Sequence, residues 1–283
     1  MSNNSDSTLQ QLGFLANIPQ NNRSPKTDEF ELEHTTVWSF PQRATWATHK
    51  SDYRGNFAPQ VARNLILTYS QANDMVLDPM VGSGTTLIEA RLLGRQGQGY
   101  DINPRAVELT SNRLQFEVAH PTQQRVQLGD VRAMQLPDES VNLIITHPPY
   151  ANIIKYSDGK NPADLSSLSN IGKFFDQLTL GLHEMYRVLK PNHYCAILMG
   201  DTRKGQHYIP LSYMLLQRAL EVGFILKEQV IKLQHNTRRA PMWRKSASNY
   251  KFYLIMHEQL FIFRKPAQGE KLTRLKWSMK QVG

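Results

Sequence analysis

The chain of 283 residues contains a single cysteine, Cys195. One cysteine cannot form a disulfide within the chain and cannot supply a cysteine-based zinc site, so the sequence predicts no metal. It also lacks any run of 18 apolar residues, which argues against a membrane span. The polar start of the chain does not resemble a signal peptide. These absences together predict a cytoplasmic protein without a membrane partner.

Acidic residues are also scarce, since 24 Asp and Glu stand against 33 Lys and Arg and give a formal net charge of +9. No acid occurs between Gln229 and His257. That stretch instead carries Trp243, Tyr250 and six cations: Lys232, Arg238, Arg239, Arg244, Lys245 and Lys251. Uncompensated cations beside aromatic residues favour contact with nucleic acid. The alternatives are a solvated basic hairpin and a basic enzyme without a polyanionic partner.

Apolar periodicity predicts strands that alternate with helices, the pattern of an α/β protein with a doubly wound, mostly parallel sheet. The predicted strands are 75–77, 97–100, 124–128, 141–146, 194–199, 224–233 and 252–264. The predicted helices are 59–70, 85–93, 104–114, 171–189 and 209–222. The last two strands have no helix between them, so we expect them to form an antiparallel final hairpin. Cys195 lies within a predicted strand, which indicates a buried residue and not a nucleophile.

A glycine-rich turn follows the first of these strands, in the segment Asp78-Pro79-Met80-Val81-Gly82-Ser83-Gly84-Thr85-Thr86. Gly82 and Gly84 allow the backbone to approach a ligand, and the helix that follows offers its amides to an anionic group. The third glycine of a dinucleotide-binding turn is replaced by Leu87, and the lysine of a P-loop is absent. The turn alone is therefore a weak indication of the ligand.

Acids follow three successive predicted strands, at Asp78, Asp101 and Asp130. An acid at the position of Asp101 can bind two ribose hydroxyls. Asp130 is placed to bind an adenine amine. This arrangement indicates a nucleoside site at the carboxyl edge of the sheet, whereas the alternative makes the acids helix caps and turn residues.

The segment His147-Pro148-Pro149-Tyr150 ends an apolar strand. Two prolines fix the backbone and remove two amide donors, which leaves the carbonyl of Pro148 as an acceptor for a substrate amine. Tyr150 offers a face on which a base can stack. The alternative interpretation is a rigid turn after a buried strand.

With both segments in view, the chain resembles the DNA amino methyltransferases, which modify adenine at N6 or cytosine at N4. The resemblance covers residues 36–265 and implies a Rossmann-like methyltransferase fold that uses S-adenosylmethionine. It implies catalytic roles for His147, Pro148, Pro149 and Tyr150. It implies cofactor contacts by Phe57, Pro59, Asp78, Pro79, Gly82, Ser83, Gly84, Thr85, Thr86, Asp101 and Asp130. The predicted organisation is a polar arm at 1–35, a catalytic domain at 36–266 with a basic loop at 234–251, and a tail at 267–283.

One residue departs from the family pattern, because His147 stands where the family has Asp, Asn or Ser. A neutral imidazole can accept a hydrogen bond from the target amine, but a protonated one cannot. The sequence Thr146-His147-Pro148-Pro149-Tyr150 is nearer to the cytosine-N4 pattern, which gives a slight lean to cytosine N4. The rivals are an RNA base methyltransferase and a non-catalytic nucleic-acid-binding protein on the same fold.

The expected partner is double-stranded DNA, whose target base must leave the stack to reach such a pocket. A cognate restriction endonuclease is a further expected partner. We expect recognition to involve the basic loop, the insertion at 151–170 and the aromatic segment 36–57. The predicted contact residues are Lys155, Tyr156, Arg238, Arg239, Trp243, Arg244, Lys245 and Lys251.

Overall fold

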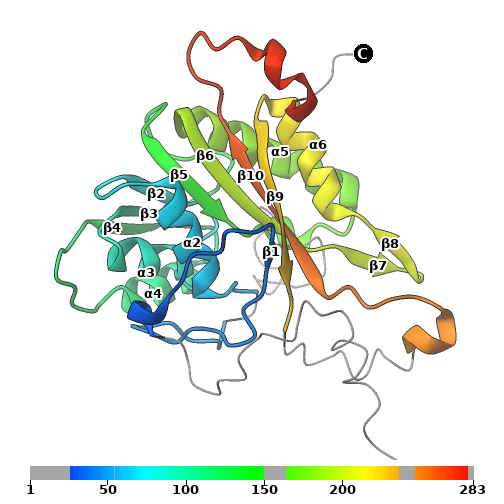
Figure 1. Ribbon diagram of the computed structural model, residues 1–283, viewed down its shortest axis with the longest axis horizontal. Coiled ribbons are helices and arrows are strands. Elements are labelled where there is room, and N and C mark those ends of the chain that lie inside the picture. Colours follow the sequence, from blue (N-terminus) through cyan, green and yellow to red (C-terminus); the bar gives the residue numbers. More distant parts are fainter. Residues whose placement is uncertain (1–25, 54, 150–163, 236–245, 280–283) are drawn as a thin grey trace, which may run out of the picture.

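The computed structural model describes residues 26–53, 55–149, 164–235 and 246–279. Within these residues, eight strands form one sheet in the order β1-β9-β10-β6-β5-β2-β3-β4 (Figure 1). The strands are β1 (Val37–Trp38), β2 (Met75–Asp78), β3 (Gln96–Asp101), β4 (Gln124–Leu128), β5 (Val141–Thr146), β6 (Leu189–Met199), β9 (Ile225–Leu233) and β10 (His257–Arg264). Two short strands, β7 (Thr202–Lys204) and β8 (His207–Ile209), pair separately as a hairpin.

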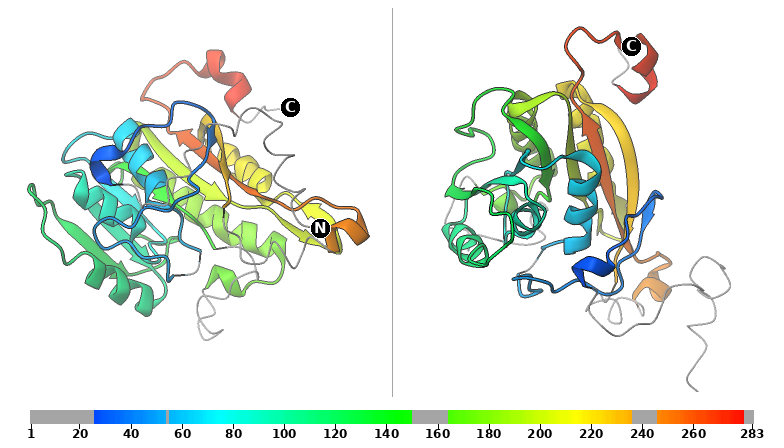
Figure 2. Two further views of the ribbon diagram at one scale, coloured as in Figure 1. Left: turned by 60° about the horizontal axis from the view of Figure 1, so that its bottom comes forward. Right: turned by 60° about the vertical axis from the view of Figure 1, so that its left-hand side comes forward.

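Helices cover both faces of the large sheet, as Figures 1 and 2 show. They are α2 (Pro59–Tyr69), α3 (Thr85–Leu92), α4 (Pro104–Arg113), α5 (Ile171–Val188) and α6 (Leu211–Val222). Short 3-10 helices occur at η1 (Thr27–Glu29), η2 (Leu165–Ser167) and η3 (Leu272–Ser278). No helix of the described residues is long and apolar enough to cross a membrane. The architecture is the doubly wound α/β fold that the alternating pattern predicts, and it confirms the Rossmann-like fold that the resemblance implies.

Strand β10 runs antiparallel to both of its neighbours, β6 and β9, whereas β2, β3, β4, β5 and β6 pair in parallel. The predicted antiparallel final hairpin is therefore confirmed. The sheet does not end at β9, because β1 pairs with it in parallel through Val37 and Trp38. The pattern of parallel strands places the ends of β2, β3, β4 and β5 at one edge of the sheet.

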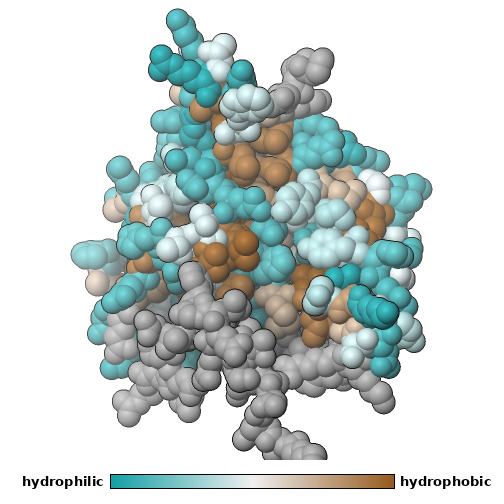
Figure 3. Space-filling view, turned by 45° about the vertical axis from the view of Figure 1, so that its right-hand side comes forward, coloured by the Kyte–Doolittle hydropathy of each residue, from teal (hydrophilic) through white to brown (hydrophobic). Residues whose placement is uncertain are grey.

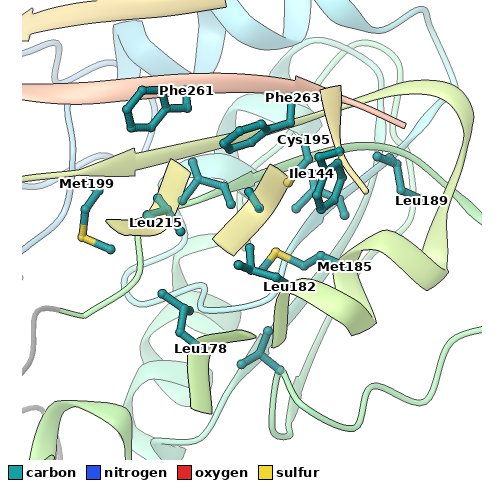
Figure 4. Close-up of a cluster of buried hydrophobic side chains, with 14 of the residues drawn as sticks. Ile144, Leu178, Leu182, Met185, Leu189, Cys195, Met199, Leu215, Phe261 and Phe263 are labelled. Atoms are coloured by element: carbon teal, nitrogen blue, oxygen red, sulfur yellow. The ribbon is translucent and has the colours of Figure 1, made fainter. Parts of the chain in front are cut away.

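Strand β5 contributes side chains to the core on both faces of the sheet, and all six of its residues are buried. Alternate residues face opposite layers, since Ile144 packs with α5 and α6 whereas Leu143 and Ile145 pack with α2. Figure 4 shows Ile144 and Cys195 in the first of these clusters. Cys195 is a buried residue of β6, as its apolar surroundings in the sequence predict.

Local sequence signals set several helix ends. Pro59 occupies the first turn of α2, where it removes no helical hydrogen bond. Asn103 caps α4 by accepting a hydrogen bond from the amide of Arg105. Gly223, with φ of 115°, ends α6 in the left-handed conformation. These signals explain why the predicted helix boundaries agree closely with the observed ones.

Two strands begin five residues away from their predicted starts, whereas the other strand boundaries agree to within one residue. Strand β6 begins at Leu189, five residues before the predicted start, because Leu189 pairs with Val141 ahead of an irregularity in register. Strand β10 begins at His257 and not at 252, so the apolar run before it lies outside the sheet. The β7–β8 hairpin was not predicted, because three-residue strands are too short to show a period.

Candidate active site

A pocket of about 820 Å³, part of it open to solvent, lies at the carboxyl edge of the sheet. Ligands of open α/β folds bind at this edge. The structure brings ten of the predicted site residues together in the wall of this pocket: Phe57, Asp78, Pro79, Gly82, Ser83, Thr85, Asp101, Asp130, His147 and Pro149. Pro59, Gly84, Thr86 and Pro148 are not among the described lining residues. Tyr150 lies outside the described residues.

The glycine turn between β2 and α3 is held by backbone conformations that favour glycine. Gly82 has φ of 52° and Gly84 has φ of 84°. A Cβ atom at Gly84 would lie 2.7 Å from the side chain of Thr110, and one at Gly82 would lie 3.2 Å from the ring of Tyr53. Both positions therefore combine a left-handed backbone with a close neighbour, which is the requirement that the sequence motif indicates.

Asp78 is fully enclosed beneath this turn. Its carboxylate accepts hydrogen bonds from the Thr86 hydroxyl at 2.6 Å and from the Met80 amide at 3.2 Å. Burial raises the pKa of Asp78 to about 7, and the nearby carboxylate of Asp101 adds to the increase. Asp78 and Thr86 thus fix the shape of the turn, which is a structural contribution to the site.

The raised pKa of Asp78 predicts how the stability of the fold depends on pH. Because the folded-state pKa of about 7 lies above the ordinary 3.8, the protonated form stabilises the fold. The free energy of unfolding should fall as pH rises from about 4 to about 7, and Asp78→Asn should remove this dependence. Urea unfolding of both proteins across this range measures it. Parallel pH profiles of the two proteins would contradict the assignment.

Asp101 ends β3 and connects the strand to the glycine turn. Its carboxylate accepts hydrogen bonds from the amides of Gly82 and Asn103, both at 2.9 Å. Burial raises the pKa of Asp101, whereas these two amide donors lower it. The side chain lines the pocket, and carboxylate oxygens have further lone pairs that can accept hydrogen bonds from ligand hydroxyls.

Asp130 also lines the pocket, but its carboxylate is already bound by Arg132. The guanidinium donates to both carboxylate oxygens at distances from 2.5 to 3.0 Å, and the Arg132 amide donates at 2.9 Å. These hydrogen bonds lower the pKa of Asp130 despite its partial burial. Arg132 therefore orients the Asp130 carboxylate. The predicted contact with an adenine amine would use the lone pairs of Asp130 that Arg132 leaves available.

Segment 43–57 closes one side of the pocket and contributes residues that the motifs did not indicate. Tyr53 contacts Gly82, and the Asn56 amide donates to the Ser83 hydroxyl at 3.2 Å. Arg113 forms an ion pair with Asp52. Asp164 and Leu165 also line the pocket, from the start of η2. The only sequence signal for Tyr53 and Asn56 as pocket residues is that they shortly precede Phe57. No sequence signal indicates Asp164 as a pocket residue.

Trp38 and Trp46 of segment 36–57 pack against the rest of the fold and so do not support the expectation that this segment contacts the target, whereas Tyr53 and Phe57 line the pocket. Trp38 is 4% exposed. The Trp46 indole donates to the Oε1 atom of Glu89 at 2.5 Å, and His49 Nε2 lies 2.8 Å from the same atom. Arg63 donates to the other oxygen of Glu89 at 2.8 Å. These contacts attach the segment to α2 and α3.

His147 follows β5 and is enclosed by groups from three parts of the chain. Its Nε2 atom lies 3.7 Å from Oε1 of Glu258 on β10, and its ring makes a hydrogen bond with the Gly55 backbone. The ring of Phe57 lies 6.2 Å away between centroids. Burial lowers the pKa of His147 and outweighs the opposing effect of Glu258, so the neutral imidazole is favoured.

Lys232 requires a correction. The sequence places Lys232 among the cations that lack a counter-charge, but its Nζ atom lies 2.9 Å from the buried carboxylate of Glu258. The two residues face each other across strands β9 and β10. Lys232 therefore neutralises Glu258 beside His147 and is not available to bind phosphate. Of the predicted nucleic-acid contacts, Lys155, Tyr156, Arg238, Arg239, Trp243, Arg244 and Lys245 lie outside the described residues.

The order of the glycine turn, the acids and the proline pair around one pocket agrees with the family comparison. A model of the DNA methylase family matches residues 8–112 and 141–282. The chain belongs to the DNA methylase family. The prediction of a DNA amino methyltransferase family is thereby confirmed.

Curated relatives match short parts of the chain. The tRNA (guanine(10)-N2)-dimethyltransferase of Methanothermobacter thermautotrophicus is 41% identical over 105 residues, which are 35% of this chain and 29% of that protein. The type II methyltransferase M.ScaI of Streptomyces caespitosus is 33% identical over 87 residues, or 29% of each chain. The matched segments thus span less than a third of either relative.

Solved structures support the fold. TrmN from Thermus thermophilus has a TM-score of 0.51 at 19% identity and covers 75% of this chain and 50% of that chain. A methyltransferase from Methanosarcina mazei, dependent on S-adenosylmethionine, has a TM-score of 0.50 at 15% identity and covers 72% and 97%. Both likenesses show the Rossmann-like methyltransferase fold.

The cofactor is S-adenosylmethionine, and the residues of the pocket fit it. The carboxylate of Asp101 suits ribose hydroxyls, and apolar side chains such as Val131 and Leu165 suit an adenine ring. The two glycines let the turn pack directly against Tyr53 and Thr110, which a side chain at Gly82 or Gly84 would crowd. Among the described residues, no group of three or more His, Cys, Asp or Glu could hold a metal ion.

Proposed function

We propose that this protein transfers a methyl group from S-adenosylmethionine to an exocyclic amine of a base in DNA. One observation carries the proposal: His147 and Pro149 of the proline-pair segment line the same pocket as Asp101 and the glycine turn. The acceptor groups and the cofactor residues therefore share one space. S-adenosylmethionine supplies an electrophilic methyl group when it is bound there.

The proposed work of the chain's own residues is to orient the amine. The lone pair of an exocyclic amine is delocalised into the ring, so the amine is a poor nucleophile. A ring nitrogen of His147 and the carbonyl of Pro148 would accept hydrogen bonds from the two N–H groups of the amine. These acceptors would also stabilise the positive charge that develops on the amine nitrogen. Pro148 is buried and is not among the described lining residues, so this contact requires the base to reach its carbonyl. Tyr150 would stack on a base that has left the duplex.

A neutral His147 is compatible with this role. An imidazole without a second proton carries one N–H donor and one acceptor nitrogen. If the N–H donates to either Glu258 or Gly55, the other nitrogen keeps its acceptor lone pair. The lowered pKa of His147 favours this form at neutral pH.

The choice of DNA as substrate is supported by the family model, and the type II methyltransferase relatives include M.ScaI and M.Cfr9I of Citrobacter freundii. The sequence around His147 gives the slight lean to cytosine N4 over adenine N6. A second candidate is the amine of guanine in RNA, because the tRNA dimethyltransferase relative is 41% identical over its matched segment. Modification within a restriction–modification system, with a cognate endonuclease, is part of the DNA proposal.

The experiment that separates these functions is transfer of a labelled methyl group from the cofactor to duplex DNA, single-stranded DNA and transfer RNA. Label in duplex DNA is the expected result. Label confined to transfer RNA would establish the RNA function instead, and label in no nucleic acid would contradict both proposals.

Asp101→Ala should weaken the binding of S-adenosylhomocysteine by about 1–3 kcal/mol, because hydrogen bonds to a charged acceptor are lost. Calorimetry measures the affinity. A matched control is Asp74→Ala, because Asp74 is an acid at the opposite end of β2 whose carboxylate accepts a hydrogen bond from the Gln71 amide. Equal affinities of the two variants for S-adenosylhomocysteine would remove Asp101 from the cofactor site.

The basic loop at 234–251 should account for part of the salt dependence of DNA binding. Neutralising Arg238, Arg239, Arg244 and Lys245 together should flatten the slope of log K against log salt by about 0.9 for each lost phosphate contact. Binding titrations at several salt concentrations measure the slope, with cofactor affinity as the control. An unchanged slope would indicate a solvated basic surface.

A further inference from the structure

Two segments that the family motifs do not include pack together, one just after the end of β6 and the other just before the start of β10. They are the β7–β8 hairpin (Thr202–Ile209) and residues 246–256, which we call the hairpin platform. Arg203 joins them, because its guanidinium donates to the Tyr253 carbonyl at 2.9 Å and to the Gln206 carbonyl at 3.0 Å. The same guanidinium lies 5.1 Å from the Phe252 ring centre and 5.4 Å from that of Tyr208. The hairpin and the loop therefore form one surface, at the lower right of Figure 1.

The charge of the hairpin platform is positive. Neither of its segments contains an acid, and Lys204, His207 and Lys251 are exposed. The neighbouring acid, Asp201, has its carboxylate satisfied by the Tyr208 hydroxyl at 2.6 Å and the Ser212 amide at 2.8 Å. The cations Arg203, Lys204 and Lys251 outnumber this one neighbouring acid, and an excess of positive charge is complementary to a phosphate backbone.

The hairpin platform also exposes large aromatic side chains. Tyr253 is 90% exposed and Tyr250 is 58% exposed. Figure 3 shows a side of the molecule on which hydrophobic residues form separate patches among hydrophilic ones. Exposed aromatic rings between exposed cations suit the bases and sugars of nucleic acid, because base stacking accepts any base.

The hairpin platform is joined to the catalytic segment through the first residues of β10. Strand β10 begins at His257, and the next residue, Glu258, lies 3.7 Å from His147. Tyr253 lies five positions before Glu258. An extended chain of that length spans at most about 18 Å, which corresponds to about five base pairs at 3.4 Å each.

We propose that the hairpin platform binds the DNA duplex within about five base pairs of the target base. In this arrangement Lys204 and Lys251 contact phosphates, while Tyr250 and Tyr253 pack against exposed bases or sugars. The inference rests on the proposed action on DNA and assigns a binding surface to it. It gives the β7–β8 hairpin, which the sequence analysis did not detect, a role in substrate binding.

The test measures binding of a fluorescent duplex in the presence of S-adenosylhomocysteine. Tyr250→Ala with Tyr253→Ala should weaken binding about tenfold or more, and Tyr253→Phe should retain it because the ring remains. Lys204→Ala with Lys251→Ala should flatten the salt slope by about 0.9 for each phosphate contact. Trp277→Ala is the matched control, because Trp277 is 78% exposed beside Lys276 in η3, near β9, and outside the platform.

Wild-type affinity for duplex DNA in the platform variants would overturn the inference, as would an equal loss in Trp277→Ala. A loss of affinity for RNA but not for duplex DNA would also overturn it. Methyl transfer is measured separately with the wild-type protein. Absence of methylated DNA there would refute the proposed function, whereas the binding comparison would still decide whether the platform is a DNA surface.

Discussion

Replacement of His147 by alanine should slow single-turnover methyl transfer by about a hundred- to a thousandfold. The loss of one preorganised group at a developing charge costs about 2.7–4 kcal/mol in comparable sites. S-adenosylhomocysteine should still bind, because the described contacts of Asp101 and the glycine turn do not involve the imidazole. His147→Asn and His147→Asp restore an acceptor of the kind found in the family and should keep partial activity.

The pH dependence of the rate gives this prediction a second readout. Protonation removes the acceptor, so activity should fall on the acid side, below the ordinary histidine value of about 6.5 because burial lowers the pKa of His147. The charge of Glu258 raises this pKa, so Glu258→Gln should move the acid limb to lower pH. The His147→Asn variant should lack the limb.

The alternative is a purely structural His147 held between Glu258 and Gly55. In that case all three substitutions would lower the melting temperature to a similar degree, and the acid limb would persist in His147→Asn. Rates of the variants across pH, with melting temperatures alongside, distinguish the two roles.

Glu89→Ala should destabilise the fold by about 3–5 kcal/mol, because it leaves buried cationic and donor groups without their acceptor. Glu89 is fully buried and binds Trp46, His49 and Arg63 at once. The Arg63 guanidinium also lies 5.1 Å from the Trp46 ring centre. Urea unfolding measures the loss.

The matched control for Glu89 is Glu221→Ala. Glu221 pairs with Arg218 at 3.3 Å on the surface of α6, where an ion pair contributes about 0–1 kcal/mol. If the two substitutions cost the same free energy of unfolding, the buried cluster does not attach segment 36–57 to α2 and α3.

Much of the fold was predictable because local signals and apolar periods agree. Strands β4 and β5 have the predicted bounds, and the Asn103 cap and the Pro59 start mark their helices. The errors have physical causes. The run before His257 is apolar enough for a strand, yet it lies outside the sheet. Tyr253 is exposed, and its carbonyl accepts a hydrogen bond from Arg203 of the β7–β8 hairpin, a contact that no local pattern predicts.

The site residues that belong to sequence motifs were predictable. The contacts between residues that are far apart in the sequence were not. The glycine turn, Asp101 and His147 were found because their spacing along the chain reflects successive strand ends. The pairing of Lys232 with Glu258 joins residues 26 positions apart, and only the register of β9 and β10 reveals it. Asp164 enters the pocket wall from η2, which no local pattern connects with the cofactor.

Methylation of DNA by this protein can be observed directly by mass spectrometry of nucleosides from DNA that has been incubated with the protein and S-adenosylmethionine. We expect a methylated exocyclic amine in DNA, with N4-methylcytosine ahead of N6-methyladenine. Unmethylated DNA, together with methylated guanine in transfer RNA treated in parallel, would contradict this expectation.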